Sequence, residues 1–382
     1  MTRREFIVHG ASTAGALTLP VGCLNAETSH LSAPDYAKTG ARIVKNATPS
    51  EDGFYYPGEW EPHEMTVMAM PPPQNWRGYA KMSTVRAQWA GVANALSEYE
   101  KVLMVVRPED RKVAPRILNR EIELIEFPLN DGWSRDSGPM VLVNKKKQRC
   151  VAGFTFNGWG AKLGAYQHDA LLKARLAAKF GLPIYPVDLV MEGGGVILDG
   201  EGTVITTEQC MLHKNRNPRK KKAEVEKILK ASLGTEKVIW LGKGLEPDPI
   251  TDGHVDGLAA FARPGVVLLH TTDLRSDPNY TVGNDARRRL QQSTDAKGRK
   301  LKVIEIPLAE KVAHMNFYIG NGCVLVPVAG DKKQDDRPMG ILREVFSDRK
   351  VIGVGGKTLA KGGGGIHCIT QQIPRGVTRI AD

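Results

Sequence analysis

The chain has 382 residues, of which 41% are hydrophobic, and a formal net charge of +11 at neutral pH. This length allows one large α/β domain, and the composition suits a soluble globular protein with a core of its own. The positive charge fits nucleic acid, an anionic surface or solubility alone, and after residue 26 no apolar run reaches the length of a transmembrane helix.

Residues 1–26 have the composition of an export signal. Arg3 and Arg4 precede the uncharged run GASTAGALTLPVG, which is too short to span a bilayer. An arginine pair before a weakly apolar run resembles a twin-arginine leader, so we expect export to the periplasm with cleavage after Ala26. PVGC, which ends at Cys23, faintly resembles a lipoprotein cleavage site, and an ordinary N-terminal helix is the alternative interpretation.

The rest of the chain divides into a linker and a catalytic domain. Residues 27–48 are polar and lack periodicity, which predicts a linker, and residues 49–382 are expected to form a single catalytic domain. Between Val85 and Tyr99 apolar residues recur at steps of four and three, which indicates one buried face of a helix. The segment AEVEKILKASLG has the same character and ends at Gly234.

A pattern of strand, polar or glycine-rich loop and hairpin recurs along the domain. The leading strands are expected at Ile122, Ile184, Val238, Val303 and Val351, which are 62, 54, 65 and 48 residues apart. Such self-similarity favours a ring, because a ring closes its own sheet edges. We therefore expect an α/β fold, a five-bladed pseudo-symmetric α/β propeller, in which the strand EMTVMAM completes the last blade. A plain mixed α/β sheet is the alternative.

A chemically suggestive residue follows each of these strands. In chain order the residues are Asp136, Glu192, His254, Asn316 and Cys368. Equivalent loops of a ring point at one axis, so we expect a single cavity that holds Asp136, Glu192, His254, Asp256 and Cys368.

This set of side chains suits a guanidinium substrate. A guanidinium is planar and permanently charged, and its forked donors fit two carboxylates, for which Asp136 and Asp256 are the candidates. Trp133 could stack on the planar cation. The guanidinium carbon is a poor electrophile, so a strong nucleophile such as the thiolate of Cys368 is needed, and a bound cation would favour that thiolate.

Proton transfer in this hypothesis falls to His254 and Glu192. His254 would protonate the departing ammonia and then activate water. Glu192 would orient that water or take a proton. The reaction would pass through a covalent thiouronium and end in a urea.

Other interpretations of these residues stay open. The HxD spacing of His254 and Asp256 permits a metal, although three carboxylates, a thiolate and one imidazole match no common metal site. None of the five cysteines forms a CxxC pair, so a zinc cluster is not expected. The cysteines expected in strands, as buried small apolar residues, are Cys150, Cys210 and Cys323. The basic run at 219–222 lacks interleaved aromatic residues and favours a solvated face over nucleic acid.

At these residues the chain resembles the agmatine deiminases and the related Porphyromonas-type peptidylarginine deiminases, within the guanidino-modifying pentein superfamily. The matching segments, in order over about residues 55–374, are PGEWEPHE, NDGWSRDSGP, FTFNGWGAK, EGGG, DGEGTVITTEQCML, KNRNP, TDGHVDG, NFYIGNG and GGGGIHCITQQIP. The resemblance implies a five-bladed α/β propeller with an axial site and no metal or organic cofactor. The roles that it implies are nucleophile for Cys368, acid–base pair for His254 and Glu192, guanidinium binding for Asp136 and Asp256, and a place near the substrate for Trp133.

Three positions depart from the family pattern. Ile250 stands where the family has a glutamate, and Gly257 and Gly365 each replace an asparagine. An acidic residue at position 250 would help to hold a distal ammonium, so its replacement bears on the substrate's tail.

The expected reaction is agmatine plus water to N-carbamoylputrescine plus ammonia. An exported peptidylarginine deiminase that converts arginine to citrulline is the alternative within the class. Outside the class, a catalytically inactive binding module and a metal-dependent hydrolase remain, and only the latter would be inhibited by a chelator. The expected partner is a small cationic guanidine or an arginine peptide, with no nucleic acid and no membrane span, and a homo-oligomer is left open.

Overall fold

The computed structural model describes residues 34–76 and 80–377. The leader predicted at residues 1–26 lies outside these ranges. Within them, no helix combines the length and the apolar character that crossing a bilayer requires.

Part of the segment predicted to be a linker is folded. Residues 34–48 contain a 3₁₀ turn, η1 (Tyr36–Thr39), and the strand β1 (Arg42–Ile43), which pairs in parallel with β7 (Pro183–Val190). The ring of Tyr36 is buried, and its hydroxyl donates to the carbonyl of Phe154. The linker prediction is therefore wrong for residues 34–48, because a strand of two residues is too short to show a periodicity.

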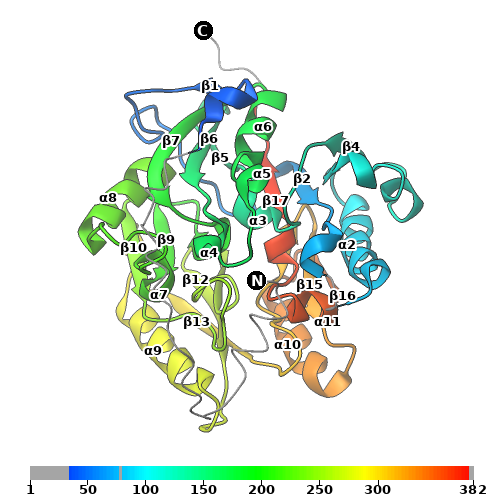
Figure 1. Ribbon diagram of the computed structural model, residues 1–382. Helices are drawn as coiled ribbons and strands as arrows, with labels where there is room; N and C mark the ends of the chain where they lie inside the picture. The colour runs from blue at the N-terminus through cyan, green and yellow to red at the C-terminus, as the bar shows by residue number, and fades with distance from the viewer. Residues whose placement is uncertain (1–33, 77–79, 378–382) are drawn as a thin grey trace, which may run out of the picture.

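The described strands form five sheets, seen around the middle of Figure 1. In hydrogen-bonded order, the sheets are β1–β7–β6 (Arg149–Thr155)–β5 (Met140–Val143); β10 (Lys237–Leu241)–β9 (Thr203–Thr207)–β8 (Val196–Leu198); β11 (Ala259–Arg263)–β12 (Val266–Thr271)–β13 (Lys302–Pro307); β14 (Tyr318–Gly320)–β15 (Cys323–Val328)–β16 (Lys350–Gly355); and β17 (Gln371–Pro374)–β2 (His63–Ala69)–β3 (Val102–Val106)–β4 (Glu123–Glu126).

The same arrangement recurs from sheet to sheet. Each sheet has one antiparallel pair, and the next strand along the sheet is added in parallel. The five predicted leading strands are confirmed as β4, β7, β10, β13 and β16. β4, β10, β13 and β16 lie at an edge of their sheets, and β7 is followed only by the two-residue strand β1. The chain after each of the five strands crosses to the next sheet, so these loops connect sheets rather than lying within them.

The last strand of the described residues pairs with the first strand along the chain in its sheet. β17 runs antiparallel to β2, with Gln371 opposite Val67, which confirms the pairing predicted for EMTVMAM. The segment after residue 362 is therefore held beside residues from the beginning of the domain.

The longer helices lie at the periphery in Figure 1 and bridge neighbouring sheets. α8 contacts β7 and β10, α9 contacts β10 and β12, and α10 contacts β13 and β16. The described helices are α2 (Met82–Ser97), α3 (Ser134–Ser137), α4 (Gly158–Ala161), α5 (Gln167–Ala170), α6 (Leu172–Lys179), α7 (Glu208–Met211), α8 (Lys222–Leu233), α9 (Asn279–Gln292), α10 (Lys332–Val345) and α11 (Lys357–Lys361), with 3₁₀ turns η2 (Pro73–Trp76), η3 (Pro108–Asp110), η4 (Ala114–Arg116), η5 (Gly193–Gly195) and η6 (His367–Ile369).

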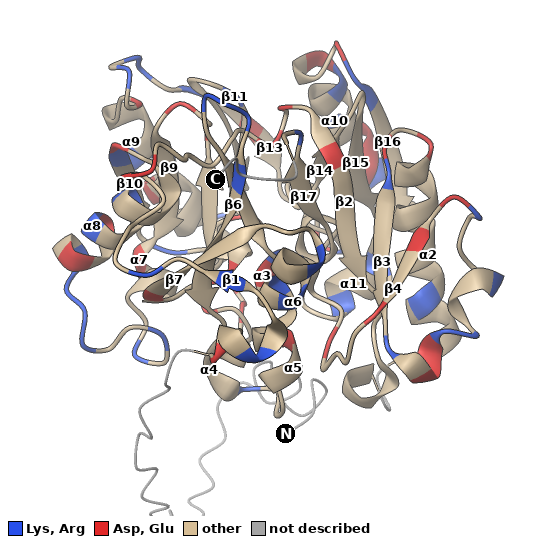
Figure 2. Cartoon of the chain, turned by 90° about the horizontal axis from the view of Figure 1, so that it is seen from above, with Lys and Arg blue, Asp and Glu red and all other residues tan. Residues whose placement is uncertain are grey.

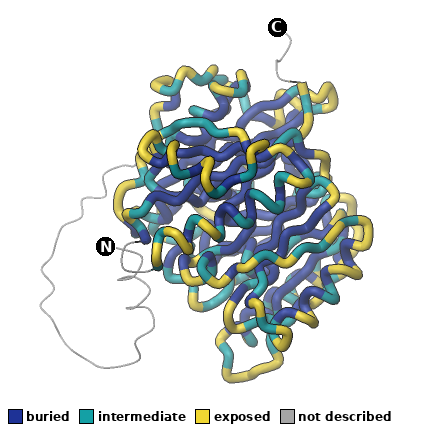
Figure 3. Tube along the Cα trace, turned by 90° about the vertical axis from the view of Figure 1, so that its right-hand side faces the viewer, coloured by how far each residue is buried: buried dark blue, intermediate teal, exposed yellow. Residues whose placement is uncertain are grey.

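Both helices predicted from periodicity are present. The apolar face of α2 is fully buried at Val85, Trp89 and Leu96. α8 ends at Gly234, whose φ of 63° is the left-handed conformation that glycine adopts at little cost. Figure 3 shows buried residues in the interior and exposed residues mainly at the periphery, and Figure 2 shows charged residues mainly in the outer helices and loops.

The cysteines of the described ranges carry free thiols. Cys150 in β6 and Cys323 in β15 are buried strand residues, as predicted. Cys210 is also buried, but it lies in the short helix α7 and not in a strand, because the side chain of Thr207 caps a helical turn directly after β9.

Candidate active site

The predicted site residues come together although they are far apart in the sequence. They lie on the connections between sheets: Asp136 is in α3, Glu192 follows β7, His254 and Asp256 precede β11, and Cys368 is in η6. Each of the five side chains is at most 8% exposed.

Gly194 marks the point at which three of these side chains meet. A Cβ atom on Gly194 would lie 2.6 Å from Nδ1 of His254, 2.9 Å from Oδ2 of Asp256 and 3.1 Å from Oδ1 of Asp136. The sequence EGGG therefore provides a backbone without side chains where an imidazole and two carboxylates converge.

Cys368 lies beside this group. Its Sγ is 3.6 Å from Oδ2 of Asp256 and 3.3 Å from Oδ1 of Asn316, which also accepts the backbone N–H of Cys368 at 3.2 Å. Burial, together with the charges of Asp256 and Asp136, raises the pKa of the Cys368 thiol well above its usual value. The pocket without substrate therefore favours the neutral thiol.

Asp136 is fixed by two donors. Its Oδ1 accepts the N–H of Gly194 at 3.0 Å, and its Oδ2 accepts Nε1 of Trp159 at 2.9 Å. Burial and the neighbouring charges of Asp256 and Glu192 still raise the pKa of Asp136, because three carboxylates share this space. A cation placed between them would relieve that repulsion.

His254 and Glu192 form a second pair in the same space. Nε2 of His254 lies 3.5 Å from Oε2 of Glu192, and Nε of Arg216 donates to Oε1 of Glu192 at 2.7 Å. Burial opposes the charge of His254, but Asp136, Cys210 and Glu192 outweigh it and raise the His254 pKa well above its usual value. Burial likewise opposes the charge of Glu192, but Arg216 and His254 lower the Glu192 pKa.

Trp133 lies at the edge of the site within an aromatic cluster. Its ring stacks on Trp76 with centroids 6.4 Å apart and meets Trp89 edge to face at 5.5 Å. A Cβ on Gly364 would lie 2.3 Å from Cζ3 of Trp133 and 3.1 Å from Sγ of Cys368, so the tryptophan and the thiol face the same glycine. Stacking of Trp133 on a substrate stays a prediction.

The glycine run before Cys368 is explained mainly by close packing. A Cβ on Gly362 would lie 2.3 Å from the ring of Trp76, and one on Gly365 would lie 2.5 Å from Oδ1 of Asn316. Of the four glycines only Gly363 has a positive φ, 87°. A left-handed backbone conformation therefore accounts for one glycine of the run, and lack of space for a Cβ accounts for Gly362, Gly364 and Gly365.

A cavity of about 450 Å³ reaches Cys368 from the surface. The polar groups of the site that line it are His254, Asp256, Asn316 and Cys368. The rest of the lining comes mostly from residues 245–251 and 360–364.

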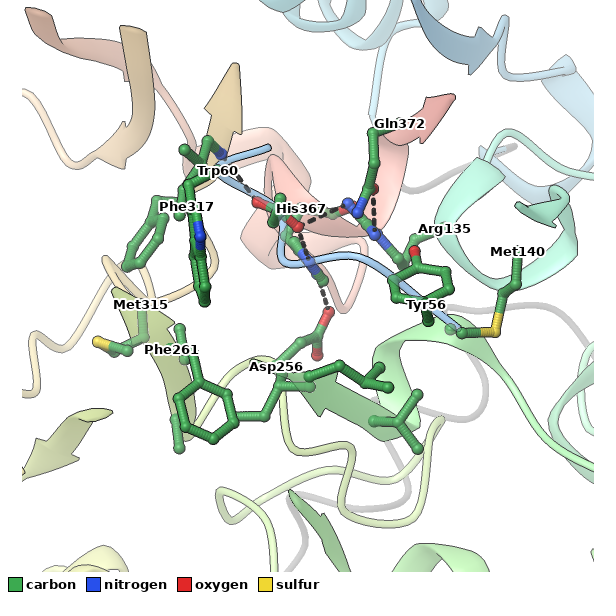
Figure 4. A pocket seen from close by; sticks show the side chains of 18 residues that line it. Tyr56, Trp60, Arg135, Met140, Asp256, Phe261, Met315, Phe317, His367 and Gln372 are labelled. Atoms are coloured by element: carbon green, nitrogen blue, oxygen red, sulfur yellow. Dashed lines mark hydrogen bonds and ion pairs between the residues drawn. The ribbon is translucent and has the colours of Figure 1, made fainter. Parts of the chain in front are cut away.

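Asp256 is also held by a network of charged side chains outside the predicted set. Figure 4 shows His367 between Asp256 and Arg135. Nδ1 of His367 lies 2.8 Å from Asp256 and its Nε2 lies 3.0 Å from Glu59, which also pairs with Arg135 at 3.2 Å. Ionised carboxylates only accept hydrogen bonds, so both ring nitrogens donate and His367 carries a positive charge.

One group of side chains has the composition of a metal site. Glu192, Cys210 and His254 place one potential ligand atom each within 4.8 Å of one another. A metal would require the thiolate and the neutral imidazole. Burial raises the pKa of Cys210, its neighbours raise that of His254, and the guanidinium of Arg216 already occupies Glu192. These three residues therefore fit a proton-bearing cluster better than a resident metal.

The sequence analysis missed several residues that contact the predicted site residues directly or, as Glu59 and Arg135 do, through His367. They are Glu59, Arg135, Trp159, Cys210, Arg216 and His367, with Asn316 noted only for its loop. All of these residues lie inside the sequence segments that resemble the deiminase family. Their place in those segments was the signal that could have identified them.

The family pattern of the Porphyromonas-type peptidyl-arginine deiminases matches residues 55–374. The chain is 39% identical over 370 residues to an agmatine deiminase of Medicago truncatula, a match that spans 86% of this chain and 98% of the relative. A solved agmatine deiminase of Enterococcus faecalis has a TM-score of 0.84 at 35% identity, over 88% of this chain and 100% of the other. A substrate-bound agmatine deiminase of C. jejuni has a TM-score of 0.77 at 25% identity, over 85% and 97%.

A buried thiol, an imidazole and paired carboxylates on an α/β fold of this shape define a class of guanidine-modifying proteins. The chain belongs to the Porphyromonas-type peptidyl-arginine deiminase family.

Proposed function

We propose that this protein hydrolyses a C–N bond of a guanidinium substrate, with Cys368 as the nucleophile. Agmatine plus water to N-carbamoylputrescine plus ammonia is the reaction supported by relatives that match almost over their whole length. The observation that carries the proposal is the placement of the Cys368 thiol 3.6 Å from Asp256, in a cavity that His254 also lines, while Asp136 meets Asp256 and His254 around Gly194.

Substrate binding and activation of the nucleophile are coupled in this mechanism. Asp136 and Asp256 hold the planar cation through paired hydrogen bonds. Burial, and after it the charges of these two carboxylates, raises the pKa of Cys368 while the pocket is empty. A guanidinium between them cancels that effect, so the thiolate forms when the substrate is bound.

The chemical steps then follow a covalent course. The thiolate adds to the guanidinium carbon, and the C–N bond breaks as His254 gives a proton to the departing ammonia. The remaining thiouronium is attacked by water, which loses a proton to His254 as the C–S bond breaks and the urea leaves. Glu192, fixed by Arg216, holds the imidazole in place through both proton transfers.

We also propose that the five sheets form the five blades of a propeller around this site. The support is that the sheets repeat one strand order, that α8, α9 and α10 each contact two neighbouring sheets, and that β17 pairs with β2. The candidate residues lie on the connections from one sheet to the next, as an axial site requires.

Peptidylarginine deimination is the second candidate. The family description and the cavity of about 450 Å³, which has room for more than a guanidinium group, favour it. Ammonia release by purified protein from agmatine, free arginine and arginine peptides, compared with Cys368→Ala, tests both candidates. Release from none of them, or full release by Cys368→Ala, would overturn the mechanism.

We propose that the protein is exported through a twin-arginine leader at residues 1–26, followed by a linker up to about residue 33 and then the catalytic domain. The support is the pair Arg3 and Arg4 before an uncharged run. Replacing both arginines by lysine should leave the protein in the cytoplasm of a host with this export route, while the parent chain is recovered from the periplasm. Equal distribution of the two proteins would refute the leader.

A further inference from the structure

The short segment α4 (Gly158–Ala161) is wound in the left-handed sense. Its four residues have positive φ angles of 65°, 55°, 82° and 57° in chain order, and ψ is 40° at Trp159 and 31° at Gly160. These values are close to those of a left-handed helix. Residues with a Cβ disfavour this conformation, and they adopt it singly rather than in runs. Trp159 and Ala161 therefore hold a backbone conformation that their own chemistry does not favour.

Contacts on both sides keep the turn in this conformation. The backbone carbonyl of Asn157 accepts the N–H of Ala161 at 2.8 Å, and its side chain accepts the N–H of Gly160 at 2.8 Å. A Cβ on Gly160 would lie 2.4 Å from Nδ2 of Asn215, so the turn packs closely against that residue. Nδ2 of Asn157 also donates to the carbonyl of Asn215 at 2.8 Å. The turn is therefore fixed by the fold around it.

Lys162, the residue after the turn, connects it to the wall of the cavity that reaches Cys368. Its Nζ donates to the carbonyls of Pro249 and Ile250 at 3.1 and 3.0 Å and pairs with the side chain of Asp252. Pro249 and Ile250 line the cavity. The turn cannot unwind without disturbing these contacts.

The turn places the indole of Trp159 against Asp136. Nε1 of Trp159 donates to Oδ2 of Asp136 at 2.9 Å, and the ring packs edge to face on Phe156 with centroids 5.1 Å apart. Oδ1 of Asp136 accepts the N–H of Gly194, so the indole fixes the second oxygen and with it the plane of the carboxylate. Because side-chain direction follows backbone conformation, a right-handed turn would aim the indole elsewhere.

The hydrogen bond from Trp159 also acts on the charge of Asp136. Burial does most to raise the pKa of Asp136, and two neighbouring carboxylates add to it. The charge of His254 and the hydrogen bond from Trp159 act in the opposite direction. Without the indole N–H, Asp136 should therefore hold its proton more tightly. The titratable groups that interact with Asp136 come from several elements, and they are Lys173, Glu192, His254, Asp256 and Cys368.

We propose that the left-handed turn at residues 158–161 orients Asp136 for the guanidinium, with Trp159 as the positioning residue. This inference rests on the proposed deiminase function and adds a residue that acts on the substrate only through Asp136. The unfavourable backbone conformation is kept because it delivers the indole N–H to that carboxylate.

Trp159→Phe removes the N–H and keeps an aromatic ring. At pH 7 it should lower kcat/KM about tenfold for whichever of agmatine, arginine and arginine peptides reacts fastest. The acidic limb of the profile of kcat/KM against pH should move to higher pH, because Asp136 then loses its proton only at higher pH, and the deficit should narrow as the pH rises. A deficit of the same size at every pH would overturn the inference.

Trp240→Phe is the matched control for this variant. Nε1 of Trp240 donates to Oε1 of Glu226 at 2.7 Å, so the control also loses an indole hydrogen bond to a carboxylate. Neither residue lines the cavity that reaches Cys368. The pH profile of Trp240→Phe should match that of the parent, and the same shift in both variants would overturn the inference.

Ala161 tests the handedness of the turn from an exposed position. Ala161→Val should disrupt the turn, because a β-branched residue strongly disfavours positive φ, and it should reproduce the shifted acidic limb of Trp159→Phe. Ala161→Gly permits the same conformation and should keep the parent profile. Ala223→Val, at an exposed alanine of the helix α8, is the control for the added valine. A parent-like profile in Ala161→Val would overturn the role of the turn.

Calorimetric binding of agmatine separates this inference from the proposed reaction. In a Cys368→Ala background, which cannot form the thiouronium, Trp159→Phe should weaken binding about tenfold and Trp240→Phe should not. If no guanidine releases ammonia while this difference is kept, the reaction is refuted and the role of Trp159 stands. Equal affinity with and without Trp159→Phe, or binding by neither protein, would overturn the inference.

Discussion

The thiol of Cys368 lies 3.6 Å from Oδ2 of Asp256, and this single relationship has two opposite consequences. With the pocket empty, Asp256 helps to keep the thiol protonated, because its negative charge disfavours a thiolate nearby. With a guanidinium bound, the same carboxylate holds the cation that makes the thiolate stable.

Asp256→Asn should therefore change two measurements in opposite directions. Without the carboxylate, the pKa of Cys368 falls, so alkylation by iodoacetamide in the absence of substrate should become faster near neutral pH. The kcat/KM for deimination should fall by about 10²-fold or more, because one side of the guanidinium fork is lost. Slower alkylation in the variant would contradict this account of Asp256.

His254→Gln should lower kcat by about 10²- to 10⁴-fold, the range typical for loss of a general acid–base residue. The amide keeps polar contacts near Glu192 but cannot carry the proton between ammonia and water. His168→Gln is the control, since His168 is exposed and lies outside the cavity. Retention of more than a tenth of the parent kcat in His254→Gln would argue for another acid.

Gly194→Ala should reduce kcat/KM strongly with little loss of folded protein. The new methyl group would lie within about 3 Å of His254, Asp256 and Asp136 and would push them apart. Gly340→Ala is the control, because a Cβ at Gly340 in α10 meets nothing within 4 Å and should stabilise the helix slightly. Equal activity of both variants would mean that the three side chains need not meet at Gly194.

The charged contacts of Glu59 should make the folded protein less stable in acid. Burial alone would raise its pKa, but His367 and Arg135 outweigh burial and lower the pKa to about 2. The stabilisation is therefore present above about pH 4.5, the ordinary value, and is lost as the pH falls towards 2. It amounts to something on the order of 3 kcal/mol.

Urea unfolding of Glu59→Gln should therefore show lower stability than the parent at pH 6, and the difference should narrow steadily below pH 4.5. Glu61→Gln, at an exposed position nearby, should follow the parent at every pH. A constant difference between Glu59→Gln and the parent from pH 6 to pH 3 would be evidence against the charged contacts of Glu59.

The features of the fold that depend on local sequence patterns were predictable. The strands β7, β10, β13 and β16 are β-branched runs between loops, so their positions and spacing are visible in the sequence. Their partners are not visible, because parallel pairing joins residues tens of positions apart. For the same reason β1 could not be predicted, because its two residues are extended only through their pairing with the long strand β7.

The site was predictable where a residue's own chemistry is unusual. Cys368 and His254 are distinctive beside glycine-rich loops, whereas Arg216 and His367 look ordinary until the fold places them against Glu192 and Asp256. Cys210 was assigned to the core because it follows a strand-like run in the sequence, and only the fold brings it to His254. Contacts of this kind depend on tertiary structure, so the only sequence signal for these residues was their place within the segments that match the family.

The central claim is that Cys368 becomes covalently bonded to the substrate. The direct measurement is mass spectrometry of enzyme quenched with acid within the first turnovers on agmatine or an arginine peptide. The account predicts a transient mass increase confined to the peptide that contains Cys368 and absent from Cys368→Ala. Ammonia released at a steady rate with no adduct on that peptide, and at the same rate from Cys368→Ala, would contradict it.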